Sequence, residues 1–218
     1  MKESLLNEFR NPPSEYRGAP FWAWNGRLDP PELRRQIRLM HRMGMGGFFM
    51  HSRVGLATPY LSAEWMDCVA ACVDEAAKLD MKAWLYDEDR WPSGAAGGLV
   101  TRNPAYRERQ LEMLTFDGAA DFRWDKQYLA AFVAVIDPPK AAGVRRLRRG
   151  EKPILAKGEK ILAFRVKVKD CTAWYNGFTY IDTMNPRAVR EFLRVTHEAY
   201  LKRFGKQFGR TIPGIFTD

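Results

Sequence analysis

The chain has 218 residues, of which 46% are hydrophobic and 28% are charged. This composition is ordinary for a globular protein with one good core, so it excludes a generally disordered chain. Lysine and arginine outnumber aspartate and glutamate by 35 to 26, and the resulting formal net charge of +9 raises the question of an anionic partner.

The first hundred residues alternate strand-like and helix-like patterns. Residues 19–25 read as a strand, and Asp29, followed by two prolines and a glutamate, caps a helix that ends near Gly44. A second strand over residues 46–51 precedes a helix capped by Ser62, and a third strand begins at Lys82. This spacing predicts parallel strands joined by right-handed helical crossovers.

The pattern changes near Thr101, where segments rich in valine, phenylalanine, isoleucine and alanine alternate with prolines and glycines. We expect a small antiparallel β insertion over residues 101–177. The strand-helix repeat then resumes with a strand over 178–182, a helix opened by Asn185, and a fifth strand over 212–218.

The predicted fold class is therefore α/β, as a partial TIM-type (β/α)8 barrel. Residues 1–100 form the first three βα units, and residues 178–218 form the fourth unit and the fifth strand. A closed barrel needs eight units and about 250 residues, so we expect either a fragment that ends mid-barrel or a sheet that a second chain completes.

The stretch WLYDEDRWPSG, residues 84–94, places three acids between aromatic residues. Flat apolar rings gain little by facing bulk water, and rings beside carboxylates are typical of carbohydrate sites. Functional groups of parallel α/β folds gather at the carboxyl ends of the strands. The polar and aromatic residues predicted to meet there and bind a sugar are Trp24, Asn25, His51, Arg53, Tyr86, Asp87, Glu88, Trp91 and Asp218.

Each of these residues could instead have a purely structural role and make no contact with a sugar. The three acids after Tyr86 could cap the following segment or pair with Arg90. Strand alternation sends Glu88 to the side opposite Asp87 and Asp89, so the three cannot all face one substrate. Glu88 and one neighbouring aspartate are the better candidates for carboxylate chemistry.

The residues at the ends of the first two predicted strands could likewise either bind a sugar or have a structural role. His51 is either a structural histidine or a sugar ligand, whereas Arg53 is the stronger candidate for substrate contact. Trp24 shares a face with Trp22 and could belong to the core, and Asn25 is the more convincing contact.

Several classes of site are disfavoured. Cys68 and Cys72 lie four residues apart, as buried helix thiols would, and three histidines without a paired-cysteine motif disfavour zinc. The basic segment over residues 144–152 reads as a solvated surface, with nucleic-acid contact as the alternative. No apolar run of membrane-spanning length and no signal peptide is seen, which predicts a cytoplasmic protein, or a periplasmic or secreted one if a leader has been removed.

Several motifs in chain order resemble one enzyme family. Residues 21–26 (FWAWNG), 51–56 (HSRVGL), 86–88 with 91–94 (YDE and WPSG), and 212–218 (IPGIFTD) are similar to the amino-terminal part of the catalytic barrel of glycoside hydrolase family 106, the α-L-rhamnosidases and their relatives. In the family pattern the last run continues with Glu-Pro, whereas this sequence stops at Asp218.

The resemblance implies a (β/α)8 barrel and inverting hydrolysis by two carboxyl groups. At least one catalytic carboxylate that the family pattern expects is absent after Asp218. Glu88 and Asp218 are the catalytic candidates of this part: Glu88 would hydrogen-bond sugar hydroxyls or tune the pKa of a partner, and Asp218 would orient the missing neighbouring acid. The resemblance also allows a calcium ion near the sugar hydroxyls. The alternatives are a non-catalytic carbohydrate-binding protein or a homo-oligomer in which two half-barrels cover each other's open edges. No membrane partner is expected.

Overall fold

The computed structural model describes residues 2–218 and divides them into two compact units. The first unit comprises residues up to Arg107 together with Cys171–Asp218, and the second comprises Glu108–Asp170. The predicted insertion over 101–177 is therefore wider than the β-rich unit, because residues 101–107 and 171–177 belong to the first unit.

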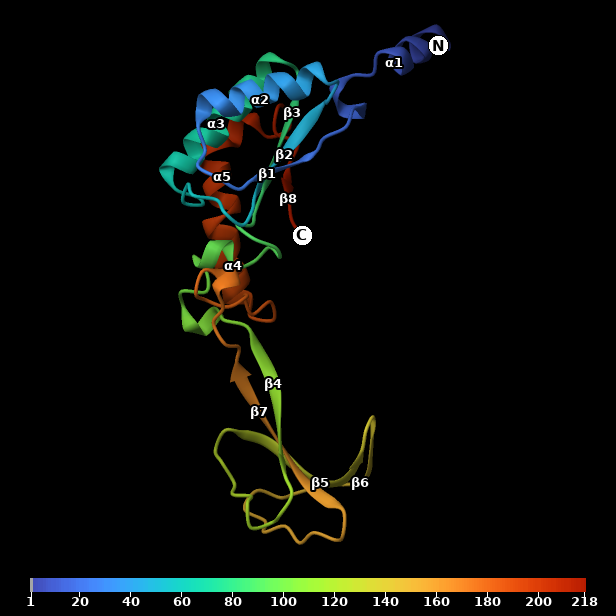
Figure 1. The fold of residues 1–218 in the computed structure, drawn as a ribbon, viewed down its shortest axis with the longest axis vertical. Coiled ribbons are helices and arrows are strands. Elements are labelled where there is room, and N and C mark those ends of the chain that lie inside the picture. Colours follow the sequence, from blue (N-terminus) through green and yellow to red (C-terminus); the bar gives the residue numbers. More distant parts are fainter. Residues whose placement is uncertain (1) are drawn as a thin grey trace. The chain divides into compact units, whose positions relative to one another are not determined.

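A parallel sheet of four strands in the order β1-β2-β3-β8 organises the first unit (Figure 1). The register pairs Trp22 with Met50, Phe49 with Trp84, and Tyr86 with Phe216. The strands are β1 (Phe21–Trp24), β2 (Gly47–Ser52), β3 (Lys82–Tyr86) and β8 (Ile215–Phe216). The predicted parallel α/β arrangement is confirmed, and the sheet is open rather than closed.

Five helices and five short 3-10 turns complete the described part of the first unit. The α-helices are α1 (Lys2–Arg10), α2 (Pro30–Arg42), α3 (Ala63–Lys78), α4 (Pro186–Val195) and α5 (His197–Phe204). The 3-10 turns are η1 (Ser14–Tyr16), η2 (Ala96–Gly98), η3 (Pro104–Tyr106), η4 (Ala173–Tyr175) and η5 (Gly205–Gln207).

The helices begin where the sequence predicts. The side chains of Asp29, Ser62 and Asn185 each accept a hydrogen bond from a backbone N–H in the first turn of α2, α3 and α4, respectively. The single helix predicted after Asn185 is divided at Thr196, whose hydroxyl donates to the Phe192 carbonyl at 2.6 Å. Such a bond to the carbonyl four residues back is a local cause of helix bending.

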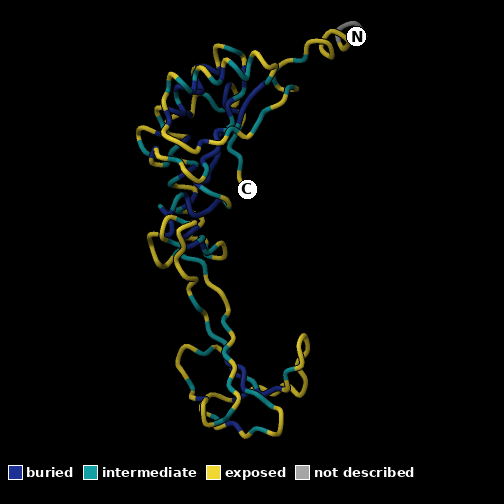
Figure 2. Tube along the Cα trace, viewed as in Figure 1, coloured by how far each residue is buried: buried dark blue, intermediate teal, exposed yellow. Residues whose placement is uncertain are grey.

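The core of the first unit lies between one face of the sheet and three helices (Figures 1 and 2). Because side chains alternate along a strand, every second strand residue points toward the helices. The buried residues of this core come from the sheet, α2, α3 and α5, and include Trp24, Ile37, Phe48, Met50, Trp65, Val69, Ala83, Leu85 and Tyr200.

The strand predicted over residues 178–182 is wrong. This segment makes isolated bridges from Phe178 to Thr172 and from Ile181 to Arg107, and β8 takes its place beside β3 in the sheet. The physical reason is local packing: Gly98, at φ +87°, leaves room for the Phe178 ring, which would lie 2.4 Å from a β-carbon there. The segment therefore packs on the loop after β3 and does not enter the sheet.

The second unit is an antiparallel sheet in the order β4-β7-β5-β6. The prediction that the insertion is antiparallel β structure is therefore confirmed. Its own small core holds Phe122, Val133 and Ile161. The strands are β4 (Arg109–Phe116), β5 (Tyr128–Asp137), β6 (Lys140–Arg146) and β7 (Glu159–Val168).

The three cysteines have free thiols, and Cys68 and Cys72 are buried in α3, as predicted. Burial raises the pKa of the Cys68 thiol to about 11 and that of Cys72 well above its ordinary value. Since the thiolate is the reactive form, iodoacetamide at about pH 8 is expected to label the exposed Cys171 alone. Mass spectrometry of the native and urea-unfolded chain counts the labels, and three labels on the native chain would contradict the buried placement.

Candidate functional site

The sheet face turned away from the helices carries a row of rings, here called the aromatic face: Phe21, Phe49, His51, Trp84, Tyr86 and Phe216. His51 stacks on Tyr86 with centroids 3.9 Å apart, and Tyr86 meets Phe216 at 5.0 Å. Phe21 is 56% exposed, so the outer part of the face is open to ligands. Partly exposed rings of this kind suit the apolar faces of sugars.

Glu88 lies at the carboxyl end of β3 and points to the aromatic face. Its carboxylate Oε1 is 2.7 Å from His51 Nε2, and only 1% of Glu88 is exposed. An ionised carboxylate only accepts hydrogen bonds, so an ionised Glu88 requires His51 to carry a proton on Nε2. Burial, together with the charges of Glu88 and Asp218, raises the pKa of Tyr86. The structure thus joins an acid, an imidazole and a phenol in one cluster.

Asp87 points the other way, toward α5, and is completely buried. Its Oδ1 accepts from Ser93 Oγ at 2.5 Å, and its Oδ2 accepts from Thr217 Oγ1 at 2.6 Å. His197 Nε2 lies 3.5 Å from the same Oδ2. Asp87 therefore ties the loop after β3 to the end of β8 and to α5, and its burial removes it from direct contact with a sugar.

Asp89 is held by a third set of partners. Ser52 Oγ donates to Oδ1 at 2.8 Å, and Asn176 Nδ2 donates to Oδ2 at 2.8 Å. Arg90 Nε lies 3.9 Å from Oδ2. Each of the three consecutive acids is thus hydrogen-bonded, with Ser93 Oγ shared between Asp87 and Glu88, because a buried carboxylate is tolerated only when it has such partners.

Asp218 is exposed and is joined to the cluster through Ser93. The backbone N–H of Asp218 donates to Ser93 Oγ at 3.1 Å, and the N–H of Ser93 donates to the Asp218 carbonyl at 3.0 Å. Ser93 Oγ also lies 3.4 Å from Glu88 Oε2. Ser93 is therefore the group that places an exposed acid and a buried acid at the same end of the sheet.

The structure places the remaining predicted site residues differently. Trp24 packs against Trp65 in the core, with 2% of its surface exposed, because its position in β1 alternates to the helix side. Asn25 is exposed, and Gly55, at φ +99°, approaches its carbonyl so closely that a β-carbon would lie 2.8 Å away. Arg53 is half-buried, and Trp91 is 52% exposed. Sugar contact thus remains open to Asn25, Arg53 and Trp91, whereas burial removes Trp24.

Sequence reasoning missed the partners that hold the acids, namely Ser52, Ser93, Asn176, His197 and Thr217. Ser93 and Thr217 stood inside the motifs WPSG and IFTD, so their position beside the acids was a usable signal. His197 and Asn176 offered none, because they reach the acids only through tertiary packing.

The calcium ion that the family resemblance allows stays a prediction. Calcium takes about six to eight oxygen ligands, whereas the acids after β3 point to separate partners. Across residues 2–218, no group of three or more histidine, cysteine, aspartate or glutamate side chains could hold a metal ion.

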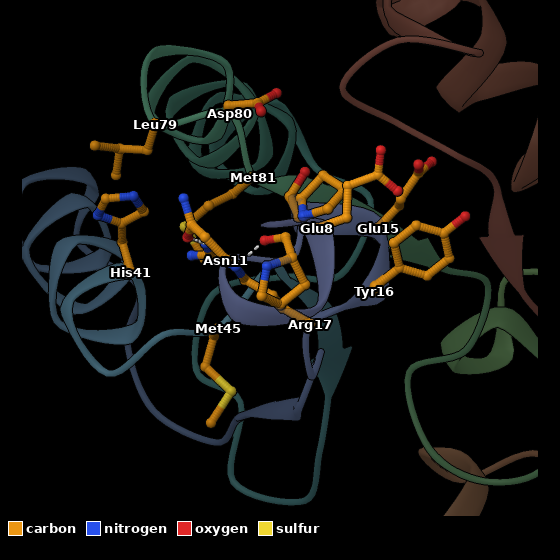
Figure 3. A pocket seen from close by; sticks show the side chains of 13 residues that line it. Glu8, Asn11, Glu15, Tyr16, Arg17, His41, Met45, Leu79, Asp80 and Met81 are labelled. Atoms are coloured by element: carbon orange, nitrogen blue, oxygen red, sulfur yellow. Dashed lines mark hydrogen bonds between the residues drawn. The ribbon is translucent and has the colours of Figure 1, made fainter. Parts of the chain in front are cut away.

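A cavity of about 680 Å³ lies at the opposite end of the strands (Figure 3). Its lining comes from Glu8, residues 11–17, His41, Met45 and residues 79–81, which precede the strands. Arg17 donates there to Asn11 Oδ1 at 2.8 Å. In parallel α/β folds the amino-terminal ends of the strands carry stability rather than chemistry. A cavity of about 320 Å³ does lie at the carboxyl ends, beside Asp89 and Arg90.

The basic segment over residues 144–152 lies in the second unit, on β6 and the turn after it. Arg145 pairs there with Glu151 at 2.6 Å, and Arg149 donates to the Lys126 carbonyl. These contacts account for two of its charges within the surface of that unit. No helix in the described part of the chain is long and apolar enough to cross a membrane.

No family model matches the chain, and no curated protein matches it. Among solved structures, the chain is similar to a rhamnosidase from Novosphingobium sp. PP1Y, with 22% sequence identity and a TM-score of 0.43. The likeness covers 60% of this chain and 15% of the rhamnosidase chain. It is too distant to carry an argument about function, and the chain spans only a small part of that protein.

Proposed function

We propose that this chain supplies part of the substrate site of a glycoside hydrolase that acts on α-L-rhamnosides or related glycosides. The observation that carries the proposal is the pairing of Glu88 with His51 on a partly exposed aromatic face, beside the exposed Asp218. The sequence motifs that resemble glycoside hydrolase family 106 support the substrate class.

The chemistry follows from the two acids. Hydrolysis of a glycosidic bond needs one carboxyl group that protonates the leaving oxygen and one that activates water or attacks the anomeric carbon. Asp218 is exposed and is the acid that can meet a ligand. Glu88 is buried and acts through His51, whose ring it orients through the 2.7 Å contact between Oε1 and Nε2.

Release of 4-nitrophenol from aryl glycosides tests the proposal. The full-length product of the gene that encodes these residues is expected to hydrolyse 4-nitrophenyl α-L-rhamnopyranoside, or a related aryl glycoside, faster than matched glycosides of the opposite anomer. Absence of release from every aryl glycoside in a panel of both anomers would contradict the enzymatic function.

A non-catalytic carbohydrate-binding protein is the second candidate, and one observation favours it. Glu88 is only 1% exposed, and its two oxygens face His51 and Ser93, so the acid holds the site in shape without touching a ligand. Calorimetric binding of L-rhamnose without turnover of any aryl glycoside would support this second function over hydrolysis.

A further inference from the structure

The hydroxyl of Ser93 lies between two carboxylates that point to opposite faces of the sheet. Ser93 Oγ is 2.5 Å from Asp87 Oδ1 and 3.4 Å from Glu88 Oε2, and it accepts the backbone N–H of Asp218 at 3.1 Å. A hydroxyl has a single hydrogen to donate, and the shorter contact assigns it to Asp87. Glu88 receives that hydrogen only when Asp87 accepts it less strongly. Ser93 therefore joins the helix side of the sheet to the aromatic face.

Asp87 is held from the helix side by two further groups. Thr217 Oγ1 donates to its Oδ2 at 2.6 Å, and His197 Nε2 lies 3.5 Å from the same oxygen. The side chain of Asp87 has no exposed surface, whereas 31% of the His197 side chain is exposed. A hydrogen gained or lost at the solvent-exposed imidazole therefore acts on a carboxylate that solvent does not reach.

The orientation of the His197 ring follows from Thr196. The Thr196 hydroxyl donates its single hydrogen to the Phe192 carbonyl at 2.6 Å, because a carbonyl oxygen only accepts. Thr196 Oγ1 must then accept from His197 Nδ1, which lies 2.9 Å away. With Nδ1 fixed as a donor, Nε2 faces Asp87 either with an N–H or with its lone pair. Only the N–H form adds a donor to the carboxylate.

The phenols beside Asp87 do not take over this role. Burial, with a further contribution from the charge of Asp87, raises the pKa of Tyr60 and of Tyr200, so both phenols keep their hydrogens. Their hydroxyls donate to the Tyr86 carbonyl at 3.5 and 3.1 Å. Burial also raises the pKa of the Tyr86 phenol on the aromatic face, where the charge of Arg53 acts in the opposite direction. His197 is thus the histidine through which solvent acts on Asp87.

We propose that His197 is a positioning residue of the substrate site proposed above. It acts through Asp87 and Ser93 on the carboxylate that holds His51. When Nε2 presents an N–H, the charge of Asp87 is shared with a third donor, and Ser93 can turn toward Glu88. When Nε2 presents its lone pair, Asp87 keeps the Ser93 hydrogen, and Glu88 is held by His51 without it. The link between the two histidines rests on these contacts, and its effect on a substrate rests on the proposed function.

Proton NMR of the 218-residue chain tests the link without any substrate. The chain has three histidines, so the imidazole C–H signal of His51 can be assigned by its loss in His51→Gln. His197→Ala is expected to move this signal at neutral pH, because Glu88 then holds the His51 ring differently. Lys202→Ala, at an exposed lysine of the same helix, is the matched control and is expected to leave the signal in place.

Two further variants show whether the effect passes through Ser93. In a Ser93→Ala chain, adding His197→Ala is expected to leave the His51 signal where Ser93→Ala alone puts it, because the shared hydroxyl is gone. His197→Gln can present an amide N–H to Asp87 and is expected to hold the signal nearer to its wild-type position. Should His197→Ala not fold, Thr196→Val, which removes the acceptor of Nδ1, replaces it with the same expectation.

Two NMR outcomes would overturn the inference. One is a His51 signal that does not respond to His197→Ala. The other is a response of the same size with and without the Ser93 hydroxyl, because the effect would then reach His51 by another route.

Turnover by the full-length gene product tests the positioning role. His197→Ala is expected to lower kcat on the aryl glycoside by about 10-fold and to change KM by less than about twofold, because it displaces a reacting group and leaves substrate binding intact. His197→Gln is expected to recover part of the lost kcat. An unchanged kcat in His197→Ala would remove the positioning role.

Failure of the inference is distinguishable from failure of the proposed function. A His51 signal that depends on His197 in a protein without turnover would leave the link and remove the hydrolase. Turnover by an enzyme whose His51 signal ignores His197 would leave the hydrolase and remove the link.

Discussion

Glu88→Gln is expected to lower kcat of the full-length gene product on its aryl glycoside by about 100-fold, the scale that a misplaced group in an active site costs, because Glu88 positions His51 and does not itself meet the substrate. The glutamine oxygen can still accept from His51 Nε2, but its NH2 group offers donors where the carboxylate offered only acceptors, so the side chain holds the imidazole ring differently. The loss is therefore expected in kcat and in the shape of its pH profile, with a smaller change in KM.

The fold of this variant is expected to persist. Glutamine keeps the shape of the side chain and an acceptor oxygen for His51 Nε2, so the loss in free energy of unfolding should stay below the about 3–5 kcal/mol that removal of one partner of a buried ion pair costs. Glu198→Gln, at an exposed glutamate of α5, is the matched control and should leave both kcat and stability unchanged. A Glu88→Gln enzyme with full kcat and an unchanged pH profile would show that the His51–Glu88 pair has no part in catalysis.

Asp87→Ala is expected to lower the free energy of unfolding by about 3 kcal/mol. Removing the completely buried carboxylate leaves the buried Ser93 hydroxyl without its close acceptor, which costs about 1–3 kcal/mol, and it also removes the acceptor of the Thr217 hydroxyl at the exposed end of β8. Asp87→Asn keeps one acceptor oxygen and is expected to cost about 1–2 kcal/mol. Urea denaturation followed by tryptophan fluorescence measures both values.

The control for this prediction is an aspartate of the same unit that lies in solvent. Asp74, whose side chain is 62% exposed, pairs with Arg34 only at 3.7 Å, so Asp74→Ala should change stability by less than about 0.5 kcal/mol. Equal stabilities of the Asp87→Ala and Asp74→Ala chains would contradict the buried network. Because Ser93 also bonds the backbone of Asp218, Asp87→Ala should in addition weaken sugar binding at the aromatic face.

The location of the candidate site followed from the sequence, but its internal arrangement did not. Strand alternation places Glu88 and His51 on one face and Asp87 on the other, as the positions in β2 and β3 require. Alternation also puts Trp24 beside Trp22 on the helix side, although its aromatic character alone suggested a sugar contact. Thus Glu88 and His51 could be paired in advance, whereas the roles of Asp87 and Trp24 depended on what lies beneath the sheet.

Local chemistry explains what the sequence determined by itself. Capping side chains at Asp29, Ser62 and Asn185 satisfy free backbone N–H groups within three residues, so they mark helix starts without tertiary information. Only the tertiary structure shows that β8 lies beside β3 and that residues 178–182 do not join the sheet. Only the tertiary structure brings His197 to Asp87 and Asn176 to Asp89, about a hundred residues apart in the chain. The physical reason is that pairing between distant segments depends on which surfaces fit together and on where buried carboxylates find donors, and neither is encoded by the residues next to them.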